Sequence, residues 1–290
     1  MIKNARTKLA LGLIMHFGPL VNKSWDNMEN IIDKIELFVL DMDGTFYLGD
    51  KMIEGSDLFM QKVKECGKRA VFFTNNSSKN KKMYVEKLAG MGCFVTGQDI
   101  MTSGDVTAQF LKRERPGKKV FLMGTPALHD CFADAGIPMT EAEDECDIVV
   151  LGFDMTLTYE KLERGCTFIR NGAEFIATHP DINCPTETGF IPDCGAMIAM
   201  MSLSTGVEPR VLGKPNKETA DMVSEVFGVD KDKIAFVGDR LYTDVACGVK
   251  NGAHGILVLS GECTMKDVEE SEVKPDMIFE RIGAICECLR

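Results

Sequence analysis

Three short apolar runs along the chain each stop abruptly at polar residues. They span residues 35–40, 70–73 and 234–237 and are rich in β-branched and aromatic side chains. The polar residues that follow them are Asp41-Met42-Asp43-Gly44, Thr74-Asn75-Asn76 and Gly238-Asp239. Runs of this length and composition predict strands that are buried on both faces of a parallel sheet.

Helical patterns separate these runs. Residues 57–66 form one such pattern and residues 218–227 another, and Lys214-Pro215 precedes the second. We therefore expect the proline in the first turn of that helix. The alternation of strand and helix predicts an α/β fold with a doubly wound, Rossmann-like parallel sheet. Ligands of such sheets bind at the carboxyl ends of the strands, so we expect all three polar clusters at one edge.

The spacing of these clusters indicates an insertion. Asp41 and Thr74 are 33 positions apart, about one strand–helix unit, whereas Thr74 and Lys214 are 140 positions apart. One further strand of the first sheet is predicted at residues 98–103. Strands of a second α/β domain are predicted at residues 118–123, 147–151 and 174–177.

These patterns divide the chain into four expected segments. They are an N-terminal extension (1–30), the first part of a core (31–113), an inserted α/β domain (114–208) and the second part of the core (209–290).

Composition narrows the classes of function. The 290 residues are 45% hydrophobic and 27% charged, which is typical of a folded globular protein. The formal net charge is −11, from 33 Lys and Arg against 44 Asp and Glu. This balance disfavours nucleic acid and anionic membranes as partners. It does not exclude a small anionic substrate at a site with local positive charge.

The eleven cysteines lack zinc-ligand spacing, and they predict reduced thiols in a cytoplasmic protein. At the N-terminus, three basic residues precede an apolar stretch over residues 9–20, which faintly resembles a signal peptide. His16, Pro19 and the lack of a cleavage site argue against that interpretation. We expect a non-essential extension, with Met28 as an alternative start.

Asp41 and Asp43 are the strongest chemical signal. They lie two positions apart, directly after a predicted buried strand, and a glycine turn follows them. One carboxylate can attack phosphorus to form an aspartyl-phosphate, and the other can protonate the leaving oxygen and later deprotonate water. The alternative is an ordinary surface turn, because Asp and Gly are common turn residues.

The other polar clusters add to this signal. Thr74 and Asn75 offer a hydroxyl and backbone N–H groups for phosphate oxygens, although such residues are also common in plain loops. Lys214 can place a cation on a phosphoryl group, although a lone lysine is usually solvated. Asp239 and Asp244 can bind or orient Mg²⁺, the alternative being a helix N-cap. All four signals occur in order at predicted strand ends, and together they indicate phosphoryl chemistry.

With the four polar clusters in this order along the chain, the sequence resembles the haloacid dehalogenase superfamily of phosphatases. Its four motifs match Asp41-Met42-Asp43-Gly44-Thr45, Thr74-Asn75, Lys214 and Gly238-Asp239-Arg240-Leu241-Tyr242-Thr243-Asp244. The insertion resembles the large α/β cap of that superfamily. Four further segments, at residues 175–181, 194–196, 211–215 and 257–261, resemble its NagD and p-nitrophenylphosphatase-like group. The likeness covers residues 33 to 290.

The resemblance implies a role for each of these residues. Asp41 would be the nucleophile and Asp43 the general acid and base. Thr74, Asn75 and Lys214 would bind the phosphoryl group. Mg²⁺ would be held by Asp41, the backbone carbonyl of Asp43 and Asp239, with Asp244 in support.

The implied activity is hydrolysis of small phosphomonoesters, such as nucleoside monophosphates, sugar phosphates or similar metabolites. Asp43 argues for a hydrolase, because the related P-type ATPases carry Thr there and keep their phosphoenzyme longer. A large cap that closes over the site favours small substrates over phosphoproteins.

The cap is expected to set substrate choice. Its specificity loop covers residues 179–194, and the residues singled out there or next to it are His179, Asp181, Glu187 and Gly195. Many relatives have Asn in place of His179, and a structural role for this histidine stays open. Met197, Met200 and Met201 are expected to pack in the core of the cap.

Two other functions stay open at this point. A phosphotransferase or mutase on the same scaffold would pass the phosphoryl group to an acceptor other than water. A non-catalytic, phospho-accepting regulatory module would resemble a receiver domain, but receivers lack an Asp at the position of Asp43 and a cap of this size. A DxD motif of nucleotide-sugar transfer ranks lowest. A homodimer through the cap is expected from the resemblance alone.

Overall fold

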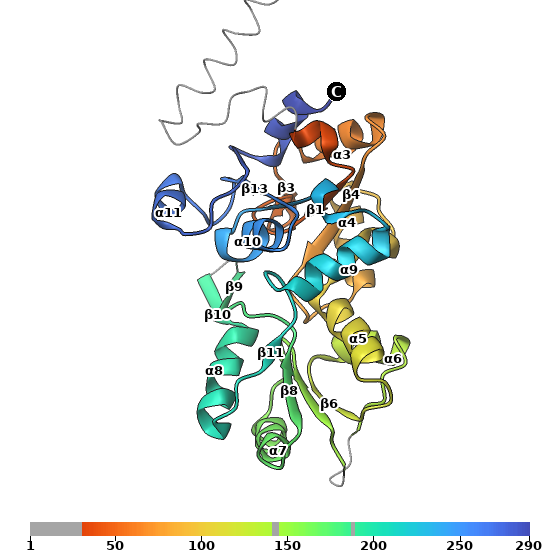
Figure 1. Cartoon of the computed structure of the whole chain (residues 1–290), viewed down its shortest axis with the longest axis vertical. Coiled ribbons are helices and arrows are strands. Elements are labelled where there is room, and N and C mark those ends of the chain that lie inside the picture. Colours follow the sequence, from red (N-terminus) through yellow and green to blue (C-terminus); the bar gives the residue numbers. More distant parts are fainter. Residues whose placement is uncertain (1–30, 141–144, 187–188) are drawn as a thin grey trace, which may run out of the picture.

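The three predicted strand runs lie side by side in a six-stranded parallel sheet (Figure 1). The computed structural model describes residues 31–140, 145–186 and 189–290. The predicted extension, with the start at Met28, and Glu187 of the specificity loop lie outside these residues. The strand order of the sheet is β14 (Met277–Phe279), β13 (His254–Val258), β12 (Ile234–Gly238), β1 (Leu37–Leu40), β4 (Arg69–Thr74) and β5 (Ile100–Thr102).

Strand β1 is central, and the chain winds outward from it in both directions. It pairs in parallel with β12 on one side and with β4 on the other. The direction of winding therefore changes at β1, which is where ligands bind in sheets of this kind. The prediction of a doubly wound α/β fold is confirmed. A two-stranded hairpin of β2 (Tyr47–Leu48) and β3 (Lys51–Met52) follows β1 directly.

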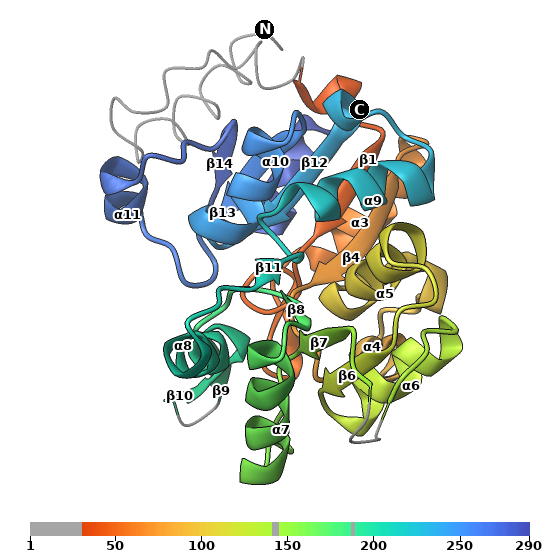
Figure 2. The same cartoon turned by 60° about the horizontal axis from the view of Figure 1, so that its bottom comes forward.

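A second parallel sheet is formed by the inserted part of the chain, at the other end of the molecule (Figure 2). Its order is β11 (Arg210–Val211), β8 (Glu174–Ala177), β7 (Ile148–Leu151) and β6 (Val120–Met123). Strand β11 lies just past the expected end of the insertion at residue 208. The antiparallel hairpin of β9 (Asn183–Thr186) and β10 (Gly189–Pro192) lies where this unit faces the core sheet.

Helices connect the strands of both sheets. In the core they are α3 (Ser56–Glu65), α4 (Lys81–Gly90), α5 (Ser103–Glu114), α9 (Lys217–Phe227), α10 (Ala246–Lys250) and α11 (Met265–Glu270). In the inserted unit they are α6 (Pro126–Asp134), α7 (Tyr159–Arg170) and α8 (Cys194–Thr205). Short 3₁₀ turns span Gly97–Asp99, Lys231–Lys233 and Ile282–Cys288.

The expected place of Pro215 was wrong. Helix α9 begins at Lys217 with Asn216 as its N-cap, so the proline lies before the helix. The backbone N–H of Asn216 donates to the carbonyl oxygen of Gly213 at 2.9 Å. This bond closes a turn that contains Lys214 and Pro215, and the turn delivers Lys214 to the sheet edge.

Alternate residues of the core strands face two hydrophobic layers. Phe38 and Phe72 point to one face, where α3 and α4 cover them, and Val39 and Val71 point to the other. The second layer also contains residues of the inserted sheet, such as Val150. One continuous hydrophobic cluster therefore joins the two sheets through α5 and α6.

The opposite face of the inserted sheet packs against α7 and α8. Met201 is fully buried there and Met197 is partly buried, as expected. Met200 is 40% exposed, so its expected place in the core of the cap was wrong. Helix α8 is apolar on most of its surface, and apolar spacing alone does not tell which of its sides is covered.

Within the described part of the chain, no helix has both the length and the apolar character needed to cross a membrane.

Replacing Phe38 tests how much the packing between β1 and α3 stabilises the core. Its ring is buried and lies edge-on to Phe59, with 5.4 Å between centroids. Phe38→Ala is expected to lower the free energy of unfolding by about 3–5 kcal/mol, because it leaves a cavity between β1 and α3. Urea unfolding followed by circular dichroism measures this. Phe94→Ala is the control, since Phe94 is 86% exposed. Equal losses in the two variants would contradict the packing described here.

Candidate active site

Three carboxylates converge at the carboxyl edge of the core sheet. Asp41 follows β1, Asp239 follows β12, and Asp244 lies in the π-helical turn Leu241–Val245. One oxygen from each lies within 4.8 Å of the others. The parallel pairing of β1 with β12 brings these positions together, although nearly 200 residues separate them in the sequence.

Lys214 reaches the same place from the turn before α9. Its ammonium donates to Asp41 Oδ1 at 2.7 Å, to Asp244 Oδ1 at 2.6 Å and to the carbonyl oxygen of Phe73 at 3.2 Å. Burial disfavours the charge on this ammonium, but the carboxylates of Asp244 and Asp41 outweigh burial and hold the pKa of Lys214 above its usual value. Lys214 is therefore a fixed cation.

The cluster carries more negative than positive charge. Burial raises the pKa of Asp41 to about 8; Lys214 opposes this shift, and Asp244 and Asp239 add to it by repulsion. Burial likewise raises the pKa of Asp239 to about 6, and repulsion from Asp244 adds to it. One ammonium does not offset three carboxylates at this distance, so the site favours a further cation.

Asp239 fits a divalent metal in particular. Its Oδ2 accepts from the backbone N–H of Glu262 at 2.8 Å. Its Oδ1 is buried and has no hydrogen-bond partner among the described residues. An all-oxygen set with one unpaired buried carboxylate oxygen suits a hard cation such as Mg²⁺. Gly261 makes room for this carboxylate, since a Cβ there would overlap with it.

Asp43 lies in the same pocket as Asp41 and stays accessible from it. Partial burial raises the pKa of Asp43, while the nearby cations Lys87, Lys79 and Arg240 oppose the shift. A carboxyl group with a raised pKa suits proton donation to a leaving oxygen.

Thr74 and Asn75 both line the pocket, and their side chains also make contacts within the protein. The Asn75 side chain holds the backbone of Lys214: its Oδ1 accepts from the Lys214 N–H at 2.9 Å and its Nδ2 donates to the Lys214 carbonyl at 3.0 Å. The Thr74 hydroxyl accepts from the N–H of Asn76 at 3.1 Å. The side-chain amide of Asn75 is thus already occupied, so the phosphate contact that the resemblance implies would have to come from its backbone N–H.

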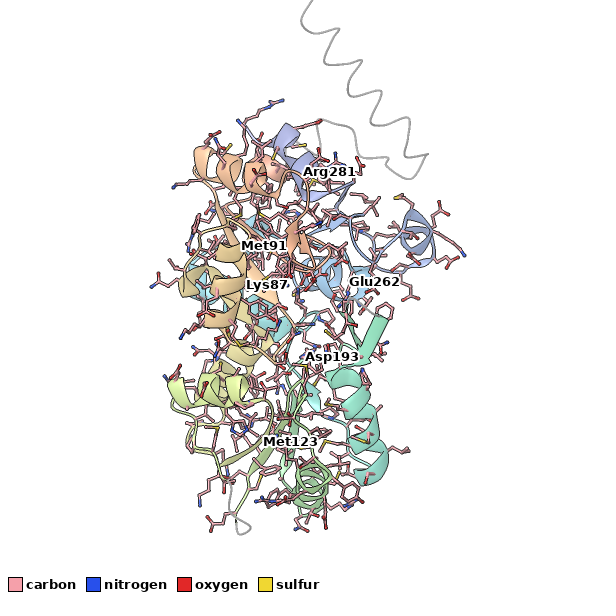
Figure 3. The ribbon with its side chains drawn as sticks, turned by 180° about the vertical axis from the view of Figure 1, so that it is seen from behind. Lys87, Met91, Met123, Asp193, Glu262 and Arg281 are labelled. Carbon is pink, nitrogen blue, oxygen red and sulfur yellow. The ribbon has the colours of Figure 1, made fainter. Side chains whose placement is uncertain are left out.

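The inserted unit closes the pocket from the opposite side. Asp181, Asn183, Cys184, Pro185 and Asp193 line it there. Figure 3 shows Asp193 at the end of the inserted unit that faces the core, with Glu262 on the neighbouring part of the core. The pocket therefore has one end built by the core, where the resemblance places the phosphoryl group, and one end built mainly by the cap, which a leaving group would occupy. We call them the phosphoryl end and the leaving-group end.

Asp181 joins the two ends. Its Oδ1 accepts from Asn75 Nδ2 at 3.0 Å, and its Oδ2 lies 3.4 Å from the Arg240 guanidinium. Arg240 also donates to Glu262 at 2.8 Å. This chain of contacts ties the cap loop to the loop that orients Asp239.

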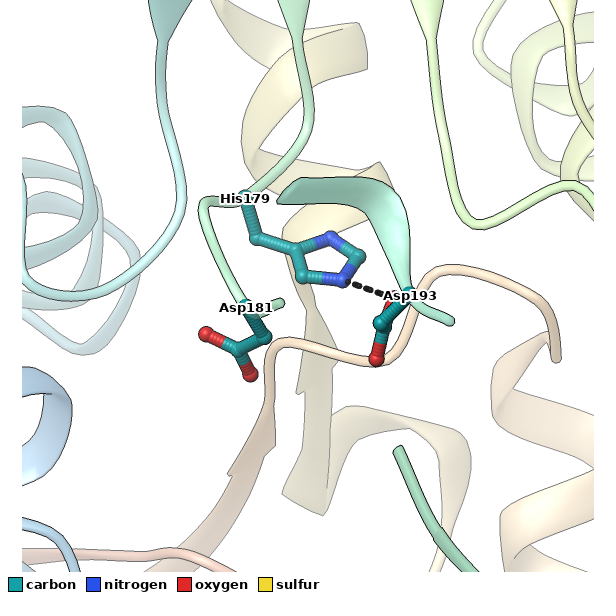
Figure 4. Close-up of side chains that lie close together, drawn as sticks. All are labelled: His179, Asp181 and Asp193. Carbon is teal, nitrogen blue, oxygen red and sulfur yellow. Dashed lines mark hydrogen bonds and ion pairs between the residues drawn. The ribbon is translucent and has the colours of Figure 1, made fainter. Parts of the chain in front are cut away.

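His179 and Gly195, both expected near substrate, are not among the residues that line the pocket. The His179 ring is fully buried and bonds to Asp193 (Figure 4). A Cβ at Gly195 would overlap with the Pro180 carbonyl, so this glycine lets α8 pack on the loop. Both placements favour a supporting role over direct contact.

Arg240, Asn183 and Asp193 line the pocket but were not singled out from the sequence. Arg240 lies inside the motif that contains Asp239 and Asp244, and its position there was the available signal. Asp193 directly precedes the Cys194-Gly195 segment, but nothing local distinguishes it from an ordinary helix N-cap.

Comparisons with known proteins agree with this architecture. A family model described as haloacid dehalogenase-like hydrolase matches residues 38–138, and a related HAD-hydrolase-like model matches residues 211–285. An acid sugar phosphatase from Staphylococcus aureus (strain MRSA252) is 36% identical over 251 residues, which cover 86% of this chain and 96% of that protein.

Solved structures give the same result. The crystal structure of 4-nitrophenylphosphatase from Thermotoga maritima has a TM-score of 0.85 and 49% identity, and the match covers 90% of this chain and 99% of that one. Glycerol phosphate phosphatase from Mycobacterium tuberculosis, solved in complex with calcium, has a TM-score of 0.81 and 30% identity, and the match covers 88% and 76%.

The chain belongs to the haloacid dehalogenase-like hydrolases, in their NagD and p-nitrophenylphosphatase-like group. The predicted class of enzyme, a hydrolase acting on phosphoric monoesters, is confirmed.

The close packing around Asp239 is testable. Gly261→Ala is expected to lower phosphatase activity at least about ten-fold while the protein stays folded, because the new Cβ displaces the Asp239 carboxylate or its loop. Phosphate release and thermal melting measure the two effects. Gly97→Ala is the control, since a Cβ there meets open space. Full activity of Gly261→Ala would show that the carboxylate position does not matter.

Proposed function

We propose that this protein is a Mg²⁺-dependent phosphatase that hydrolyses small phosphomonoesters through an aspartyl-phosphate on Asp41. One observation carries the proposal: the Asp41 carboxylate faces the pocket, bonded to a buried lysine and next to Asp43, Asp239 and Asp244. Few other reactions need a carboxylate nucleophile, a second carboxyl group and a fixed cation at one point.

In the first step, a carboxylate oxygen of Asp41 attacks phosphorus and the bond from phosphorus to the ester oxygen breaks. Asp43 gives its proton to the leaving oxygen, so that a neutral alcohol departs. In the second step, water attacks phosphorus and Asp43 takes a proton from it. The phosphoryl group leaves as inorganic phosphate and Asp41 is restored.

The chain stabilises charge at several points during these steps. Lys214 faces the oxygens of the transferring group, as do the Thr74 hydroxyl and the backbone of Asn75. When bound by Asp41, Asp239, Asp244 and the backbone carbonyl of Asp43, Mg²⁺ would offset the repulsion between a carboxylate and a phosphate dianion. Such a local positive field reconciles a net charge of −11 with an anionic substrate.

Substrate size follows from the pocket. The cap residues Asp181, Asn183, Cys184 and Pro185 approach the core motifs closely, which favours small metabolites such as sugar phosphates or nucleoside monophosphates. The named relatives, an acid sugar phosphatase and a glycerol phosphate phosphatase, support this range. We also propose a cytoplasmic location, which the eleven free cysteines support, and a homodimer through the cap.

The proposal predicts that Asp41→Asn loses essentially all activity, because an amide does not attack phosphorus. Phosphate release from p-nitrophenyl phosphate with Mg²⁺ measures this. Asp134→Asn, an exposed carboxylate of α6, is the matched control. Equal activity of wild type and Asp41→Asn would reject the nucleophile. Transfer to added alcohols in place of water would favour a phosphotransferase, and a long-lived phosphoenzyme without turnover would favour a regulatory module.

Metal removal gives a separate prediction. Treatment with EDTA is expected to abolish activity and excess Mg²⁺ to restore it, because the three carboxylates then repel both one another and the substrate. Asp239→Asn is expected to need a higher Mg²⁺ concentration for half-maximal activity, since it weakens one metal ligand. Activity that persists after EDTA treatment would contradict the proposed metal.

A further inference from the structure

Two buried carboxylates, Asp181 and Asp193, face the leaving-group end of the pocket from the cap. With His179 they form a tight group in which one nitrogen or oxygen atom from each residue lies within 4.8 Å of the others (Figure 4). A carboxylate accepts hydrogen bonds and donates none, so each one needs donors around it.

Asp181 has its donors within the protein. Asn75 donates a hydrogen bond to one of its carboxylate oxygens, and Arg240 donates to the other. Its function is therefore to dock the cap loop on the core. Arg240 is in turn shared with Glu262, so its charge is balanced by two carboxylates. This leaves little positive charge at this end of the pocket for a second anionic group.

Only one of the two carboxylate oxygens of Asp193 accepts hydrogen bonds from the described part of the protein. Its Oδ1 accepts from His179 Nε2 at 2.9 Å and from the Cys194 N–H at 2.6 Å. Its Oδ2 has no hydrogen-bond partner among the described residues, although the residue is only 3% exposed and lines the pocket. A carboxylate oxygen of a pocket-lining residue that has no protein donor can accept a hydrogen bond from a ligand.

His179 fixes the direction of this oxygen. The ring is fully buried, and its Nδ1 lies 2.9 Å from the Thr178 hydroxyl and 3.4 Å from the Ser103 hydroxyl at the start of α5. Nε2 thus faces Asp193 in a set orientation and holds Oδ1 away from the pocket.

We propose that Asp193 is a specificity-determining residue that accepts a hydrogen bond from a hydroxyl group of the leaving alcohol, and that His179 positions it. The inference rests on the proposed phosphatase function and names its substrate class: phosphate esters of polyhydroxylated alcohols. The neighbouring carboxylates disfavour substrates with a second anionic group. A metal ion among His179, Asp181 and Asp193 is disfavoured, because hydrogen bonds already occupy five of the six potential ligand atoms.

Two substrates that differ in hydroxyl groups test this proposal: glycerol 3-phosphate and n-propyl phosphate. Wild type is expected to prefer glycerol 3-phosphate in kcat/KM. Asp193→Ser keeps an N-cap for α8 but removes the carboxylate. It is expected to lower kcat/KM for glycerol 3-phosphate about ten- to hundred-fold, mostly through KM, and to leave n-propyl phosphate within about two-fold.

Two further variants separate recognition from structure. Asp193→Asn keeps an oxygen for His179 and Cys194. It is expected to lower kcat/KM for glycerol 3-phosphate but not for n-propyl phosphate, by a smaller factor than Asp193→Ser does. His179→Gln is expected to reduce the preference for glycerol 3-phosphate as well, and to leave n-propyl phosphate hydrolysis unchanged. Asp134→Asn is the matched control, and thermal melting reports folding.

Several outcomes would overturn the inference. Equal losses on both substrates in Asp193→Asn would show a structural role only. Equal wild-type rates on both substrates would show that hydroxyl groups are not recognised, and a preference for phosphoethanolamine would show an ammonium site instead. A wild type that hydrolyses none of these three phosphate esters, and not p-nitrophenyl phosphate either, would refute the proposed phosphatase function. That result differs from the outcomes above, which refute only the role of Asp193.

Discussion

The site depends on one buried lysine among mutually repelling carboxylates. Asp41 and Asp244 lie close together because β1 and β12 end at the same edge, with Asp244 in the π-helical turn after β12, and without a cation between them this edge would be unstable. Lys214 supplies that cation, with bonds of 2.7 and 2.6 Å. Leaving a buried ion-pair partner uncompensated typically costs about 3–5 kcal/mol. The ion pair therefore couples the order of the site to the stability of the fold.

A second group of contacts maintains Lys214 itself. Asn75 binds the backbone of Lys214 on both sides, and Asp181 of the cap binds Asn75. The side chain of Asn75 thus holds the lysine in place, and through Asn75 the cap contributes to the geometry at the core. The active site is consequently a product of both sheets, although the groups with chemical roles come from the core alone.

The core sheet and its motifs could be predicted from the sequence because their signal is local. A buried strand followed by Asp41 or Asp239 is visible in a few residues, and parallel topology then places them together. The roles of His179, Asp193 and Arg240 could not be predicted, because they depend on which cap residue meets which core residue. Asp193 looks like an ordinary N-cap, and only the fold shows that it also lines the pocket. Pro215 was misplaced because a turn and a first helical turn share the same local preference.

The hydrophobic cluster that runs from the core strands through α5 and α6 into the inserted sheet limits how this enzyme can be rebuilt. A cap taken from a relative would have to match not only the loop over the pocket but also the apolar surface of α5 at its base. Cap exchange in this group is therefore a problem of core packing first and of recognition second. Evolution would face the same limit, so new substrates are reached more easily by changing loop residues such as Asn183 and Asp193 than by replacing the whole insertion.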